Sequence, residues 1–103
     1  MRAPISLRLP PECWWFIQIM RSSPTALPLP DDVLMALSRA PSVEMIASIS
    51  EPRLVVDLTR TQAEVLQRWL QALLDDLPQE DDRWLTCLHC IGRLAVAIRL
   101  SEA

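Results

Sequence analysis

Residues 54–77 constrain the fold of this 103-residue chain more than any other stretch. Positions 54–58 are apolar and mostly β-branched except for Asp57, which is typical of a short strand with one exposed position. Thr59 and Gln62 follow in the capping-box spacing, in which each side chain accepts a hydrogen bond from the other residue's backbone amide. We therefore predict a strand over 54–58 and a helix that begins directly after Thr59.

The segment from Arg60 to Leu77 has the pattern of an amphipathic helix. Its apolar residues cover about half of the helix circumference, more than packing on one side requires. This wide face predicts that the helix contacts more than one neighbour. The apolar residues are Ala63, Val65, Leu66, Trp69, Leu70, Ala72, Leu73, Leu74 and Leu77.

Pro78 should end that helix, and a second helix should follow it. Glu80, Asp81 and Asp82 suit the positive end of a helix dipole. The second helix then places Trp84, Cys87, Leu88 and Ile91 on one face.

Residues 93–100 allow two interpretations. Gly92, the only glycine, predicts a left-handed end of the second helix. The period-two alternation after it favours a strand, whereas Ala95 and Ala97 favour a continued helix. We expect a strand here.

The first half has a similar but weaker pattern. Asp31 is predicted to cap a helix of about ten residues that ends before Pro41. The remaining predicted segments are a strand over 4–9, a helix from about Pro11 to Ser22, a proline-rich connector over 23–30 and a weakly alternating strand over 43–49.

Two halves of the chain match each other at an offset of about fifty residues. Residues 5–10 align with 54–59, residues 27–32 with 77–82, and residues 49–51 with 100–102. We therefore predict a single α+β domain over 1–103, with pseudo-repeats over 3–51 and 53–102. Each repeat is a β-α-α-β unit, and the short strands form one sheet covered by helices. The alternative is a mainly helical chain with two short strands.

Composition excludes several classes of protein. The chain is 50% hydrophobic, its formal net charge is −3, and all ten cationic residues are arginine, as is typical of a GC-rich genome. No basic face can be identified, so we expect no nucleic-acid partner. Three cysteines without a secretory signal favour the reducing cytoplasm of what we take to be a bacterial chain. The apolar runs are shorter than the ~20 residues of a membrane span, so we expect no integral membrane association.

Trp14, Trp15 and Phe16 are consecutive, so they point in different directions in a helix. A small domain has difficulty burying all three, and aromatic side chains are common anchors of protein interfaces. We therefore expect Trp14, Trp15, Phe16 and the broad apolar face around Trp69 to form an interface. A helix enclosed on all sides is the alternative.

Cys87, His89 and Cys90 form the most suggestive polar string. On a helix the two cysteines share a side while His89 points away, so the set does not converge on one metal ion. We expect no metal and no cofactor. The sequence also lacks a phosphate-binding loop, a nucleophile elbow and paired histidines, so we expect no enzyme activity.

These patterns predict a small non-catalytic interaction protein that forms a homodimer or acts as an adaptor to a larger partner. The alternative is a thiol- or metal-responsive regulator that uses Cys87 and Cys90, with His89 as a further ligand.

Overall fold

The computed structural model describes residues 4–22, 28–38 and 54–101 of the chain. Within them lie two strands and four helices, which confirms the α+β fold and fits equally the alternative of a mainly helical chain with two short strands. The elements are β1 (Ile5–Leu9), α1 (Pro11–Arg21), α2 (Asp31–Leu37), β2 (Leu54–Leu58), α4 (Arg60–Asp76) and α5 (Asp82–Ser101).

β1 and β2 form a two-stranded antiparallel ribbon. Ile5 lies opposite Leu58 and Leu9 opposite Leu54, which centres the pairing on Leu7 and Val56. Along β1 the apolar positions are buried and the two polar positions are exposed. The ribbon therefore buries one face and presents the other to solvent, as the period of two predicts.

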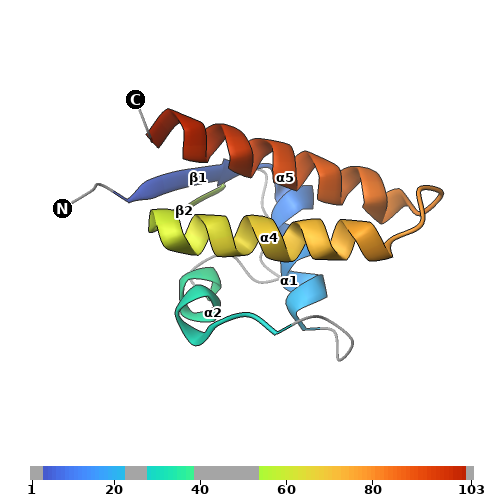
Figure 1. Ribbon diagram of the computed structural model, residues 1–103, viewed down its shortest axis with the longest axis horizontal. Coiled ribbons are helices and arrows are strands. Elements are labelled where there is room, and N and C mark those ends of the chain that lie inside the picture. Colours follow the sequence, from blue (N-terminus) through green and yellow to red (C-terminus); the bar gives the residue numbers. More distant parts are fainter. Residues whose placement is uncertain (1–3, 23–27, 39–53, 102–103) are drawn as a thin grey trace.

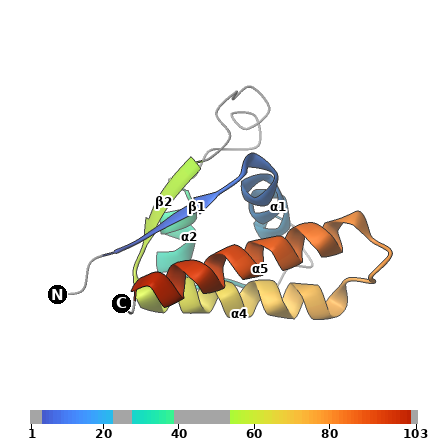
Figure 2. The ribbon, with the colours of Figure 1, turned by 90° about the horizontal axis from the view of Figure 1, so that it is seen from above.

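The helices cover the buried face of the ribbon. α4 and α5 run antiparallel, side by side, and form one layer. The ribbon and α1 form a second layer that lies on one side of this helix pair (Figures 1 and 2). α2 packs against β2 and α4. α4 thus contacts α5, α2 and β2, which confirms that its wide apolar face meets more than one neighbour.

The helix starts follow local sequence signals. Thr59 Oγ1 accepts a hydrogen bond from the Gln62 amide, and Gln62 Oε1 accepts one from the Thr59 amide, so the predicted capping box is present. The prediction that Asp31 caps α2 is wrong. Pro30 occupies the capping position without a side-chain hydrogen bond, and Asp31 is the first helical residue, where its charge suits the helix dipole.

The strand predicted over 93–100 is wrong, because α5 continues as one helix to Ser101. Its buried residues Cys87, Cys90, Leu94 and Ile98 recur every three or four positions and face the core. Gly92 lies inside this helix and has no positive φ, so it is not a left-handed cap. The continued helix leaves Val96 and Leu100 exposed, whereas a strand would have placed them on the same face as Leu94 and Ile98.

Each half of the described chain has the same order of one strand and two helices. In the alignment of the two halves, Ile5 corresponds to Leu54 and Leu9 to Leu58. In the antiparallel ribbon, Ile5 instead pairs with Leu58 and Leu9 with Leu54. This register is what a pseudo-two-fold relationship between repeats would produce. The duplication stays a prediction, and the strand expected over 43–49 lies outside the described residues.

Candidate interaction surface

Of the four aromatic residues predicted to form an interface, three are buried and one is exposed. Trp14, Phe16 and Trp69 are buried in the common hydrophobic core. Trp15, which lies between Trp14 and Phe16 in sequence, is 43% exposed. Of these four side chains, only Trp15 is available to another molecule without a change in the fold.

The largest group of exposed apolar side chains is on α5. Leu85, Leu88, Val96 and Leu100 are between 42% and 71% exposed. Their spacing of three, eight and four residues places them along one side of the helix, with Gly92 in the gap. We call Leu85, Leu88, Gly92, Val96 and Leu100 the outer face of α5.

The outer face could have been inferred from the alanines. Ala95 and Ala97 favour the helical interpretation of 93–100, and a helix there necessarily leaves Val96 and Leu100 outside the core-facing stripe. The alternation of apolar residues outweighed that signal in the sequence-based prediction.

α5 combines an apolar sequence with little burial. Among the described residues, it is the one helix long and apolar enough to cross a membrane by length and composition. Only 17% of its most apolar 18-residue window is buried. Core helices with such a sequence are mostly buried, whereas the outer face of α5 is exposed among the described residues.

The charges along α5 change sign from one end to the other. Glu80, Asp81 and Asp82 lie at its start, and Arg93 and Arg99 lie in its second half. Arg83 Nη2 lies 2.6 Å from Asp81 Oδ2, and this hydrogen bond lowers the pKa of Asp81 to about 2. Asp81 therefore stays ionised at neutral pH.

The three thiols do not form an accessible site. Cys13, Cys87 and Cys90 are free and fully buried. Cys87 Sγ lies 3.2 Å from the Leu70 carbonyl oxygen, and burial raises the pKa of this thiol to about 11. A thiol in that state is a poor nucleophile and a poor metal ligand at neutral pH.

His89 does not join the cysteines. It is exposed, and its Nε2 accepts a hydrogen bond from Arg93 Nε, 3.3 Å away. Among the described residues, no group of three or more His, Cys, Asp or Glu side chains is placed to hold a metal ion. His89 thus lies outside the core that encloses Cys87 and Cys90.

Two hollows flank the ribbon on opposite sides. One, of about 410 Å³, lies between β1 and the second half of α5 and includes Arg8 and Arg93. The other, of about 290 Å³, lies at α2 and the start of α4 and includes Asp31, Asp32 and Asp57. The first is therefore cationic and the second anionic.

Comparison with known proteins adds no assignment, because no protein-family model, curated protein or solved structure matches the chain.

Proposed function

We propose that this chain is a small, non-catalytic cytoplasmic interaction protein that forms a homodimer through the outer face of α5. The observation that supports this function best is the exposure of Leu85, Leu88 and Val96 on the most apolar helix of the described chain. Water-exposed apolar side chains in a contiguous row are typical of a surface that another protein covers.

A second copy of α5 is the occupant that suits this face. If two copies pack antiparallel about Gly92, Leu88 of each copy lies level with Val96 of the other. The absent side chain at Gly92 lets the two helices approach closely at the crossing point. The same arrangement brings the acidic start of one helix toward the basic second half of the other, which favours antiparallel over parallel packing.

The expected affinity is modest. Burying Leu85, Leu88 and Val96 from both copies gains roughly 6–12 kcal/mol, at about 1–2 kcal/mol for each partly exposed side chain. Association costs about 4–15 kcal/mol in lost translational and rotational freedom. At the favourable end of both ranges the net gain is about 8 kcal/mol, which corresponds to a dissociation constant of about 1 μM. We therefore expect a readily dissociating dimer rather than an obligate one.

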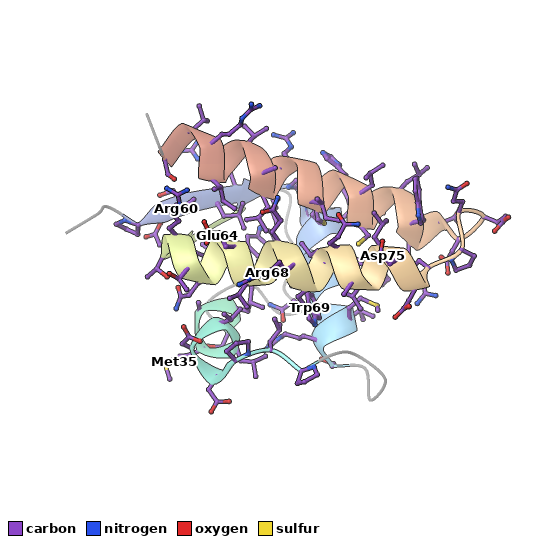
Figure 3. All side chains as sticks on the ribbon, in the orientation of Figure 1. Met35, Arg60, Glu64, Arg68, Trp69 and Asp75 are labelled. Atoms are coloured by element: carbon purple, nitrogen blue, oxygen red, sulfur yellow. The ribbon has the colours of Figure 1, made fainter. Side chains whose placement is uncertain are left out.

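The test is sedimentation velocity from about 1 to 300 μM, which spans the expected dissociation constant. Wild-type protein should shift from monomer to dimer over this range, and Leu88→Glu should remain monomeric because it places a charge opposite Val96 of the second copy. Met35→Glu is the matched control, because Met35 is also exposed but projects from α2, far from α5 (Figure 3). Dimerisation of the Leu88 variant, or a monomeric wild type at the highest concentration, would overturn the proposal.

A lipid surface is the second candidate for the same face, because α5 has the length and composition of a membrane helix. Arg93 and Arg99 disfavour burial of the helix within hydrocarbon. Co-sedimentation with liposomes of phosphatidylcholine and phosphatidylglycerol separates the two cases. If the protein pellets with the liposomes and Leu88→Glu abolishes this pelleting, the lipid surface is favoured. If the protein stays in solution and Leu88→Glu abolishes its dimer, the homodimer is favoured.

A further inference from the structure

We propose that the groove between β1 and the second half of α5 binds an extended segment of a partner protein, which adds to the free edge of β1 and places an acidic side chain against Arg8 and Arg93. The groove shares Val96 and Leu100 with the outer face of α5, so a bound segment and a second copy would compete for these two side chains. It takes a different occupant and also uses β1 and Arg93, so it does not require the homodimer.

The groove lies along the side of β1 that faces away from β2. Five consecutive positions from Pro4 to Arg8 line one wall, and the other wall consists of Arg93, Val96, Ala97, Leu100 and Ser101. No described residue of β2 lines it. Its volume of about 410 Å³ is within the range of about 300–1,000 Å³ that ligand sites occupy.

The backbone of β1 offers hydrogen bonds to this groove. In an antiparallel pair, alternate residues point their N–H and C=O groups away from the partner strand. Apart from the ladder with β2, the hydrogen bonds found for the described residues of β1 include only one, from Ser6 Oγ to Asp57 Oδ1 at 2.9 Å. The outward backbone groups of β1 are therefore free to pair with an added strand.

The charge of the groove selects the sequence of that strand. β1 and α5 run in opposite directions (Figure 1), so Arg8 lies toward Arg93 and Pro4 lies toward Ser101. Among the described residues, Arg8 forms no ion pair, and Arg93 donates a hydrogen bond to His89 Nε2 rather than to a carboxylate. Two guanidinium groups without a carboxylate partner favour an acidic side chain at this end of the groove.

The opposite end of the groove favours other residues. Asp57 lies beside Ser6 and would repel a second carboxylate there. Val96, Ala97 and Leu100 form an apolar wall that suits alternate aliphatic side chains of the bound strand. The preferred partner is thus an extended segment with alternating aliphatic residues and one Asp or Glu at a set position.

The first stage of the test is selection of binders from a phage-displayed library of random heptapeptides on the immobilised full chain. We expect enriched peptides to alternate aliphatic and polar residues and to share an Asp or Glu at one position. No enrichment, or enrichment without a shared acidic position, would overturn the proposal.

The second stage measures an enriched, fluorescein-labelled peptide by fluorescence anisotropy. The double variant Arg8→Ala with Arg93→Ala should raise the dissociation constant at least tenfold, whereas Arg99→Ala, an exposed arginine outside the groove, should change it less than twofold. Two further peptides carry N-methyl groups on alternate residues, one at the odd positions and one at the even positions. One of them should lose binding and the other should retain it, because an added strand donates hydrogen bonds to β1 from every second amide only. Equal losses for the two methylated peptides, or equal binding of the unmodified peptide to the double variant, would overturn strand addition at this groove.

A last comparison separates the groove from the homodimer. Leu88→Glu should retain peptide binding, since Leu88 does not line the groove. If the arginine variants abolish self-association instead, and no peptide binds, the occupant is a second copy and the partner-segment proposal is wrong.

Discussion

Gln18 of α1 donates a hydrogen bond from Nε2 to the backbone oxygen of Leu37, the last residue of α2, at a distance of 3.2 Å. The last carbonyl groups of a helix lack partners within the helix, so the Gln18 amide satisfies one that α2 cannot satisfy by itself. Gln18 is 5% exposed and is the one buried polar side chain among the described residues. A polar contact inside the core thus connects the ends of two helices that a proline-rich segment separates in sequence.

Gln18→Ala should lower the free energy of unfolding by about 1–3 kcal/mol, because it removes the amide and leaves the Leu37 oxygen buried without this partner. The matched control is Gln71→Ala, at an exposed position on α4, which should change stability by less than about 0.5 kcal/mol. Urea denaturation followed by tryptophan fluorescence measures both. Equal effects of the two substitutions would show that the buried hydrogen bond contributes nothing specific.

Thr59→Ala should destabilise the protein by about 1 kcal/mol, since it removes the acceptor for the Gln62 amide at the start of α4. Thr59→Ser keeps that acceptor and should restore most of the loss. Thr61→Ala, at an exposed helical position two residues later, serves as the control and should be neutral to slightly stabilising, because alanine has the higher helix propensity. Chemical denaturation would contradict the capping role if the alanine and serine variants at position 59 were equally unstable.

Gly92→Ala should stabilise the monomer by about 0.5–1 kcal/mol, because alanine has the higher helix propensity. The backbone is helical at this position, and an added Cβ meets no atom within 4 Å. Thermal unfolding at low concentration, where the protein is monomeric, isolates this effect. A decrease in stability would mean that residue 92 is not inside an open helix face.

The bulkier Gly92→Leu should leave the monomer folded and weaken self-association, because it separates the two helices at their crossing point. Sedimentation velocity compares its dimer dissociation constant with that of the wild type. A tighter dimer would show that close approach at Gly92 is not part of the interface.

Stability should fall as the pH rises above about 9. Burial raises the pKa of Cys87 from 9.0 to about 11, so between these values the unfolded chain has lost a proton that the folded protein retains. Unfolding then releases a proton, which means that higher pH favours the unfolded state. Hydrogen bonding between Cys13 and Cys90 raises the pKa of Cys90 and lowers the pKa of Cys13, so these two thiols act on stability in opposite directions and the slope is assigned to Cys87.

Denaturation at pH 8, 9, 10 and 11 would measure that slope, and Cys87→Ala should reduce it. Titration with a thiol reagent under native conditions should find all three cysteines unreactive, and elemental analysis should find no stoichiometric metal. Rapid reaction of Cys87 or Cys90, or a bound metal ion, would instead favour the thiol- or metal-responsive regulator.

Local patterns in the sequence predicted most of the secondary structure. The apolar, mostly β-branched run over 54–58, the capping box at Thr59 and the helix end before Pro78 each depend on residues within one turn or one strand. The strand predicted over 93–100 failed because its alternation is local too, while the choice of helix depends on Cys87, Cys90, Leu94 and Ile98 packing together against distant elements.

The sequence by itself determined where α4 begins, at the capping box of Thr59 and Gln62, and where the two described strands lie. It also determined that half of the residues are hydrophobic. Only the tertiary structure decided which of them stay exposed: Trp14 is enclosed while its neighbour Trp15 is not, and α5 rather than α1 presents the longer apolar row. The physical reason is range. A helix start depends on hydrogen bonds between near neighbours, whereas burial depends on which surfaces segments far apart in the chain bring against each other.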